Sequence, residues 1–457
     1  MLKWTRLCAV GFVASMALAS LVQFAASDQV PHTTFAVTPA QPLMDDRLGI
    51  TISGLPANRL ITIRAKSKAQ DKLWWRSAAV FSSGPNGTID LSSQAPISGA
   101  YRGADGMGLF WSMEPDASPK SGDRAFFAVV DWLAPIVTEI EAMDAHEVLG
   151  SVNVERRFAK PGVRRTPVAE GGIVGLLYDP GDGRRHKGVI VLGGSEGGFG
   201  GPEAAMLASR GFTALSLAYF GVQGLPLTLQ NIPLEYFGKA VQWMRVSPMV
   251  DAGFIAAFGT SRGAEAALML AATYPEIKAV VAKSPSHVRW EGVTARRLPG
   301  GPAWTFNGKP LPYVANRIPF GFLMRYMWDT LAGIPVAQTP LFLEDLADFG
   351  ETAKAEIPVE RINGPVLLLS GKDDQIWPST LMAERVMDRL RRNRHPYRYV
   401  HLSYEEAGHS LPIAYEPLRG LRQGMKLAIG GTPEGTSRAQ ADCWPKILDF
   451  LLSASAH

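Results

Sequence analysis

The stretch FIAAFGTSRGAEAALML, Phe254 to Leu270, decides the fold class of this chain. A short apolar run typical of a buried strand ends in GTSRG at 259–263, and Ala-rich sequence typical of a helix follows at once. A serine in a sharp turn between a strand and a helix is the pattern of a nucleophile elbow. Glycines fit such a turn because backbones crowd there. The first N–H groups of the helix would face any anion beside Ser261. We therefore interpret Ser261 as a candidate nucleophile.

The same G-x-S-x-G pattern occurs a second time, as GGSEG at 193–197, which makes Ser195 a rival nucleophile. Further glycines at 198–201 delay any helix, so this turn lacks the compact form of an elbow. We expect the loop to supply backbone N–H donors to an oxyanion, with the N–H of Ser195 acting beside that of Arg262. A plain connecting loop is the alternative. A phosphate cradle would need a Walker lysine or a ribose-binding acid, and both are missing, so we predict no cofactor.

Apolar runs alternate with helical sequence on both sides of the elbow. This alternation predicts a doubly wound, mostly parallel sheet, and hence an α/β-hydrolase domain over residues 161–457. The expected strands are 188–192, 212–218, 253–258, 279–284, 365–370 and 397–402, and the expected helices 202–210 and 233–246. Residues 285–361 are rich in Pro, Gly and aromatic residues, which indicates a lid over a site or packed irregular surface.

Residues 28–160 are β-rich and precede a Pro- and Gly-containing linker at 158–167. Short alternating runs separated by turn residues predict an immunoglobulin-like β-sandwich. The expected strands are 48–53, 59–64, 74–82, 88–91, 108–113, 125–130 and 137–142. Because this region carries no combination of nucleophile, acid and base, we interpret it as a structural or substrate-gating module.

The acid and base are sought just beyond strand ends, where such sheets place their ligands. Asp373 and Asp374 follow the 365–370 strand, and Asp374 is our candidate acid with Asp373 its close rival. The alternative for either aspartate is a purely structural role as the cap of the helix expected near Pro378. Among the histidines after Asp374, only His409 lies in a loop behind a strand beside a glycine. The order Ser, Asp, His is that of α/β-hydrolases, with His409 moving the Ser261 proton and Asp374 orienting His409.

Composition limits the classes of partner. The 457 residues suggest at least two domains, and 46% hydrophobic with 19% charged residues is typical of a globular enzyme. The net charge is +4 without a basic patch, and the basic run 389–394 is interpreted as a solvated helix end, so no nucleic-acid partner is predicted. No His, Cys and Asp residues cluster at ligand spacing, so no metal is predicted.

The N-terminus has the pattern of a secretory signal peptide. Lys3 and Arg6 precede an apolar run from Leu7 to Phe24, and small residues follow up to Ser27. We expect residues 1–27 to be removed and the protein to be exported, to the periplasm or outside the cell, with no other membrane partner. An uncleaved membrane anchor is the alternative, because the run is near the lower length limit for spanning.

Several motifs together resemble one known family, that of the acyl-CoA thioesterases and bile acid-CoA:amino acid N-acyltransferases. The motifs are GADGMGLFWSMEP (103–115), LGGSEGG (192–198), LAYF (217–220), IPLEYF (232–237), GKDDQIW (371–377) and AGH (407–409). The resemblance covers nearly the whole chain after the signal segment. It implies an N-terminal β-sandwich, a catalytic α/β-hydrolase domain, and Ser261, Asp374 and His409 as nucleophile, acid and base.

The nucleophile position implies a reaction type within that family. Thioesterase members carry serine there and amino-acid-conjugating members carry cysteine, so Ser261 favours hydrolysis of an acyl thioester. Familiar members act on CoA thioesters inside cells, so either the N-terminal segment is not an export signal or the substrate is another ester, thioester or amide. The alternatives are an N-acyltransferase, a general carboxylesterase or peptidase-like hydrolase, and a binding protein with an inactive hydrolase fold.

Overall fold

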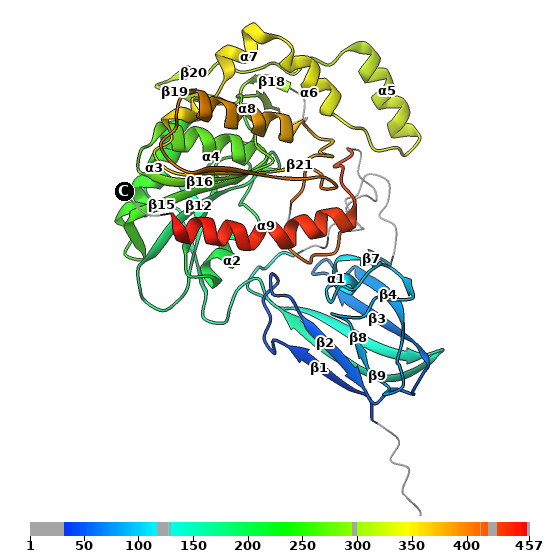
Figure 1. The fold of residues 1–457 in the computed structure, drawn as a ribbon. Helices are drawn as coiled ribbons and strands as arrows, with labels where there is room; N and C mark the ends of the chain where they lie inside the picture. Colours follow the sequence, from blue (N-terminus) through cyan, green and yellow to red (C-terminus); the bar gives the residue numbers. More distant parts are fainter. Residues whose placement is uncertain are drawn as a thin grey trace, which may run out of the picture.

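The computed structural model describes residues 32–116, 127, 129–294, 299–411, 413–418 and 427–454 (Figure 1). The expected signal peptide at 1–27 lies outside the described residues, as does half of the strand expected at 125–130. Within the described ranges, no helix has the length and apolar character needed to cross a membrane.

The core of the larger domain is an eight-stranded sheet formed within the described part of the chain. Strand β11 is antiparallel to both of its neighbours, β10 at one edge of the sheet and β13, and the strands from β13 to β22 at the other edge are parallel to one another. In spatial order the strands are β10 (Arg164–Val168), β11 (Val174–Asp179), β13 (Thr213–Ala218), β12 (His186–Leu192), β15 (Val250–Thr260), β16 (Ile277–Lys283), β21 (Val366–Gly371) and β22 (Tyr399–Tyr404). This mixed, mostly parallel sheet confirms the predicted α/β class.

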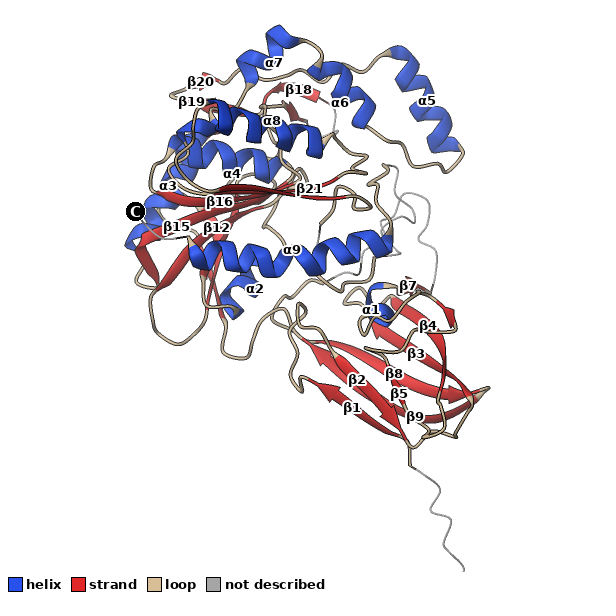
Figure 2. Cartoon of the chain, in the orientation of Figure 1, coloured by secondary structure: helices blue, strands red, loops and turns tan. Residues whose placement is uncertain are grey.

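Helices cover both faces of the sheet (Figure 2). One face packs against α3 (Leu234–Val246), α4 (Arg262–Thr273) and α8 (Ser379–Arg392). The other packs against α2 (Glu203–Ser209) and α9 (Pro433–Ser453). Sequence reasoning missed α9, although its start carries a signal. Thr432 accepts a hydrogen bond from the N–H of Gly435 at 2.9 Å, and Pro433 opens the helix, which is a typical N-terminal cap.

The N-terminal strands form two antiparallel sheets around one apolar core. One sheet contains β1 (Thr34–Thr38), β2 (Gly49–Ser53) and β5 (Ile89–Asp90). The other contains β6 (Ser98–Gly99), β4 (Trp74–Ser82), β3 (Leu60–Lys68), β8 (Ile136–Asp144) and β9 (Glu147–Arg156), with β7 (Glu114–Pro115) pairing to β4. Along β3 and β4 burial alternates residue by residue, because successive side chains of a strand point to opposite faces. The immunoglobulin likeness of this domain stays a prediction.

The strand predicted at 108–113 is wrong, because this segment contains the short helix α1 (Gly108–Trp111). All of its residues are buried, and an apolar run without alternation does not distinguish a buried strand from a buried helix. Asp105 favours the helix because its carboxylate accepts hydrogen bonds from the N–H of Met107 at 2.9 Å and from Nε1 of Trp111 at 2.8 Å.

Residues 285–361 are partly packed into the body of the larger domain. Trp304 is 1% exposed in the core beside α3, where β14 (Ile232–Pro233) pairs with β19 (Trp304–Phe306). By contrast, α5 (Phe320–Leu331) buries none of its residues (Figure 1). The other elements here are β17 (Glu291–Val293), β18 (Pro299–Pro302), β20 (Lys309–Pro310), α6 (Thr339–Leu346), α7 (Phe349–Ala355) and a 3₁₀ turn (Val359–Arg361). A lid function for this region stays a prediction.

Candidate active site

Ser261 lies in a strained turn between β15 and α4. Its φ is 57° and its ψ is −123°, a conformation that costs free energy for a residue with a side chain and is typical of functional sites. A Cβ on Gly259 would lie 2.0 Å from the carbonyl oxygen of Gly263, and a Cβ on Gly263 would lie 2.3 Å from that of Gly193. Both glycines are therefore required, and the turn is pressed against the end of β12.

The structure brings Ser261, His409 and Asp374 together from three different strand ends. His409 Nε2 lies 2.9 Å from Ser261 Oγ, and His409 Nδ1 lies 2.9 Å from Asp374 Oδ2. With its proton on Nδ1, the imidazole donates to the carboxylate and accepts the hydroxyl proton on Nε2. Trp377 packs edge-on against the imidazole, with the ring centroids 5.7 Å apart. Such an arrangement can deprotonate a serine hydroxyl as it attacks a carbonyl carbon.

The two neighbouring aspartates have different partners. Asp374 is 5% exposed, and its Oδ1 accepts hydrogen bonds from the N–H groups of Ile376 at 3.0 Å and Trp377 at 3.2 Å. Asp373 is exposed and accepts a hydrogen bond from the N–H of Gly431 at 2.7 Å. Only Asp374 therefore faces His409, and its own loop holds the carboxylate in place.

Ser195 lies in the loop after β12, next to the elbow. Tyr219 Oη donates a hydrogen bond of 2.7 Å to the carbonyl oxygen of Gly193, and the N–H of Gly194 donates to Glu196 Oε1 at 3.2 Å. These bonds fix the peptide between Gly193 and Gly194, one peptide before the N–H of Ser195. Within the described part of the chain, the Ser195 side chain forms no hydrogen bond to a histidine.

Arg262 opens α4 directly after the candidate nucleophile. As the first residue of the helix, it has a backbone N–H without a partner inside the helix. Its side chain turns into the core, where Nη2 donates to the carbonyl oxygen of Trp290 at 3.1 Å and Nε lies 3.3 Å from Glu265 Oε2. Burial raises the pKa of Glu265. Only the main chain of Arg262 is therefore available beside Ser261.

Sequence reasoning missed Lys283 and Ser284 at the end of β16. The Lys283 carbonyl oxygen accepts the N–H of Ser261 at 2.8 Å, and Lys283 Nζ donates to the carbonyl oxygen of Leu411 at 2.9 Å. Ser284 Oγ donates to the carbonyl oxygen of His409 at 2.6 Å. The sequence did carry a signal for this lysine, since Lys283 is a charged residue at the end of an otherwise mostly apolar strand. Residues at and just beyond strand ends line the site in such sheets.

A buried ion pair accompanies Lys283. Its Nζ lies 2.7 Å from Glu203 Oε1, and Lys283 is only 3% exposed. Burial opposes ionisation of Glu203, but the charge and hydrogen bond of Lys283 prevail and lower the pKa of Glu203. Among the described residues, no group of three or more His, Cys, Asp or Glu side chains is arranged to hold a metal ion.

Comparison with known proteins identifies the family. The model described as acyl-CoA thioester hydrolase/BAAT N-terminal region matches residues 45–170, and that described as BAAT/acyl-CoA thioester hydrolase C terminal matches residues 232–456. Acyl-coenzyme A thioesterase 1 of Rattus norvegicus is 31% identical over 92% of this chain and 96% of its own length. The peroxisomal succinyl-coenzyme A thioesterase of Mus musculus is 30% identical over the same shares.

Among solved structures, a putative dienelactone hydrolase from Klebsiella pneumoniae is similar with a TM-score of 0.39 and 16% identity, over 64% of this chain and 98% of that one. The family models match in both domains, and the sequence likeness to named thioesterases extends over nearly the full length. This chain therefore belongs to the acyl-CoA thioester hydrolase/BAAT family of enzymes.

Proposed function

We propose that this protein is a serine hydrolase that cleaves acyl thioesters through a covalent acyl-enzyme on Ser261. The observation that carries the proposal is the 2.9 Å contact between Ser261 Oγ and His409 Nε2 at a strained strand-to-helix turn. Asp374 completes the set by holding the other ring nitrogen. This is the division of labour that nucleophilic acyl transfer requires.

The reaction proceeds in two halves. Ser261 Oγ attacks the thioester carbonyl carbon while its proton passes to His409 Nε2, and the N–H groups of Ser195 and Arg262 stabilise the oxyanion. The C–S bond then breaks, and the leaving thiol takes the proton from His409. In the second half His409 deprotonates a water molecule that attacks the Ser261 ester. The products are a carboxylic acid and a thiol, and Ser261 regains its proton.

The substrate class follows from the relatives. The named relatives are thioesterases of acyl-coenzyme A and of succinyl-coenzyme A, so acyl-CoA is the first substrate class to test, with another ester, thioester or amide as the natural substrate if the chain is exported. A serine acyl-enzyme is an oxygen ester, which amines attack less readily than a thioester. Hydrolysis is therefore favoured over transfer to an amino acid.

The test is a comparison of hydrolysis rates on mature protein with acyl-CoA, p-nitrophenyl ester and aminoacyl amide substrates. We expect the highest kcat/KM with acyl-CoA and release of free carboxylic acid whether or not glycine or taurine is added. Amide products with glycine or taurine would instead identify an acyltransferase. A preference for the p-nitrophenyl ester would identify a carboxylesterase.

We also propose that the chain is exported after removal of residues 1–27, on the evidence of the charged and apolar pattern at its start. The measurement is N-terminal sequencing of the protein recovered from each cell fraction of an expressing bacterium. A mature chain beginning near residue 28 outside the cytoplasm is expected. A full-length chain that stays in the membrane fraction would instead identify an uncleaved anchor.

A further inference from the structure

The segment that follows His409 packs into the core of the N-terminal domain, although it belongs to the hydrolase part of the chain. Ala414, Tyr415 and Leu418 are 2%, 6% and 2% exposed within that core. The N–H of Leu418 donates a hydrogen bond of 3.0 Å to the carbonyl oxygen of Trp111, in α1 of the N-terminal domain. The chain carrying His409 is therefore attached to the other domain.

Arg156 of the N-terminal domain binds this segment through two hydrogen bonds from its side chain. It is the last residue of β9 and is 2% exposed. Both its Nη1 and its Nη2 donate to the carbonyl oxygen of Tyr415 at 3.3 Å, and its guanidinium carbon lies 4.3 Å from the centre of the Phe110 ring. A planar guanidinium that stacks on an aromatic ring has a fixed orientation and therefore donates to its acceptor from one direction. The flexible ammonium group of a lysine has no such fixed orientation.

The hydrolase domain holds the other end of the same segment. Ser284 Oγ donates to the carbonyl oxygen of His409 at 2.6 Å, and Lys283 Nζ donates to that of Leu411 at 2.9 Å. The two domains thus hold one backbone segment from opposite ends, and His409 lies at the hydrolase end.

We propose that the N-terminal domain positions His409 against Ser261, with Arg156 as the positioning residue. The inference rests on the proposed function, since it assigns a catalytic contribution to a domain without catalytic groups of its own. A proton transfer between Ser261 and His409 depends on their separation, and a displacement of about 1 Å costs up to about 100-fold in rate. Holding the loop at Tyr415 limits that displacement.

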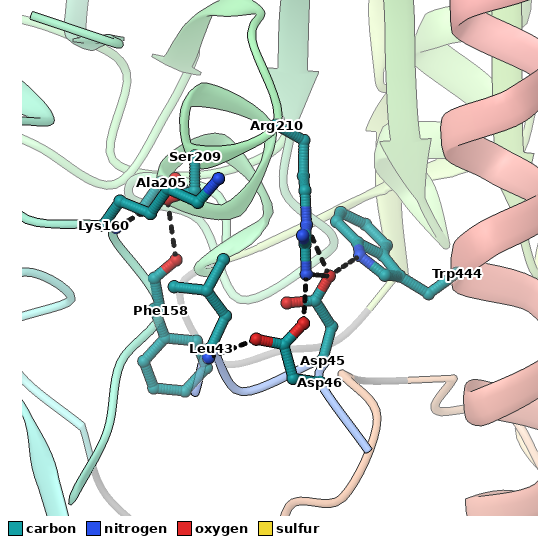
Figure 3. A network of polar contacts seen from close by, with 9 residues as sticks. All are labelled: Leu43, Asp45, Asp46, Phe158, Lys160, Ala205, Ser209, Arg210 and Trp444. Carbon is teal, nitrogen blue, oxygen red and sulfur yellow. Dashed lines mark hydrogen bonds and ion pairs between the residues drawn. The ribbon is translucent and has the colours of Figure 1, made fainter. Parts of the chain in front are cut away.

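A matched control is available at a second arginine that joins the two domains (Figure 3). Arg210, at the end of α2, donates to Asp45 at 3.0 and 2.8 Å and to Asp46 at 2.8 Å. Asp45 also accepts Trp444 Nε1 at 2.8 Å. This contact likewise links the domains, but here the arginine belongs to the larger domain and its acceptors to the N-terminal domain, and the segment 410–418 takes no part in it.

The variants are Arg156→Lys, Arg156→Met and the control Arg210→Met. Arg156→Lys keeps a positive charge but loses the paired donation of Nη1 and Nη2 to Tyr415. It therefore still tests the positioning role if Arg156→Met does not fold. Burial lowers the pKa of Arg156 to about 10, so the guanidinium is charged at neutral pH. Burial also raises the pKa of the nearby Glu416 to about 8, so at pH 7 Arg156→Met leaves a mostly protonated neighbour.

The primary measurement is the rate at which a fluorophosphonate labels Ser261, with melting temperature, kcat and KM measured alongside. For Arg156→Lys we expect labelling and kcat to fall about 10- to 100-fold with KM unchanged. Arg210→Met should lower the melting temperature while labelling stays near the wild-type rate. Equal losses of labelling in both arginine variants, or wild-type labelling in folded Arg156→Lys, would overturn the proposal.

The labelling assay separates this inference from the proposed function. Fluorophosphonates react with an activated serine whatever the natural substrate. If wild-type protein labels at Ser261 but cleaves no thioester, the substrate proposal fails while the Arg156 comparison still decides the positioning role. If wild-type protein does not label at all, the serine mechanism and the positioning inference fail together.

Discussion

Two turns in this protein share the pattern G-x-S-x-G and have different structures. At 259–263 the strand ends, Ser261 adopts a φ of 57°, and α4 begins at the next residue. At 193–197 the chain leaves β12 and no helix begins until Glu203. The two loops nevertheless touch, because Gly263 lies against the carbonyl oxygens of Leu192 and Gly193.

The difference shows that the residues around a motif determine its role. In a tight turn from a strand into a helix, the side chain of the turn residue is exposed at the end of the sheet. The first N–H groups of the helix lie beside it without partners inside the helix. A glycine-rich loop without a helix exposes backbone rather than a directed side chain. The expected division is a nucleophile at Ser261 and a main-chain donor at Ser195, and four comparisons test it.

The largest effect is expected from the two serines. Ser261→Ala should lower kcat by about 10⁴-fold or more, because the nucleophile is lost. Ser195→Ala should leave turnover close to wild type, because the backbone N–H survives the substitution. Turnover of an acyl thioester by both purified variants is the measurement. Retained activity in Ser261→Ala with loss in Ser195→Ala would reverse the assignment.

The next largest effect is expected from the two neighbouring aspartates, of which only Asp374 contacts the imidazole of His409 in the structure. Asp374→Asn should lower kcat by about 10³- to 10⁴-fold, because an amide no longer fixes the useful tautomer of His409. Asp373→Asn is the matched control, since that carboxylate contacts Gly431 and not the imidazole. Fluorophosphonate labelling should fall in the first variant only. A larger loss in Asp373→Asn would transfer the acid role to it.

The first glycine of each pattern tests how tightly each turn is packed. In Gly259→Ala the new Cβ would lie 2.0 Å from the carbonyl oxygen of Gly263, and we expect about 3 kcal/mol of lost stability. In Gly193→Ala the nearest atom is Gly200 Cα at 3.4 Å, an ordinary contact, so stability should change by less than about 1 kcal/mol. Urea unfolding of both variants measures the difference. Equal destabilisation would contradict the packing difference between the turns.

The smallest effect concerns the hydroxyl that holds the second turn. Tyr219→Phe removes the donor to the Gly193 carbonyl oxygen, and Tyr236→Phe removes both a bond of 2.6 Å to that of Ala218 and the acceptor of the Val174 N–H at 3.0 Å. Tyr219→Phe should cost about 1 kcal/mol of stability, and Tyr236→Phe more, because it removes two hydrogen bonds. Only Tyr219→Phe should also lower kcat, because only that bond fixes the loop of Ser195. Unchanged kcat in Tyr219→Phe would argue against this loop as an oxyanion donor.

Local sequence patterns were enough to predict the α/β class and to single out the two G-x-S-x-G turns, at 193–197 and 259–263, as candidate parts of the site. Buried parallel strands are apolar without interruption, so their runs and the helical sequence between them are visible in one dimension. The elbow is equally local, because its strand, turn and helix are consecutive in the chain. The order of Ser261, Asp374 and His409 added the candidate acid and the candidate base, since each follows a strand whose end faces the same edge of the sheet.

Tertiary contacts decided what local pattern left open. Asp373 and Asp374 are adjacent in sequence, and only the path of the loop turns one of them towards His409. The roles of Lys283 and Arg156 depend on carbonyl groups far along the chain, at Leu411 and Tyr415. A hydrogen bond to a distant backbone carbonyl leaves no trace in composition or periodicity, because every residue type supplies the same acceptor. For that reason, the link between the N-terminal domain and the histidine loop became visible only in three dimensions.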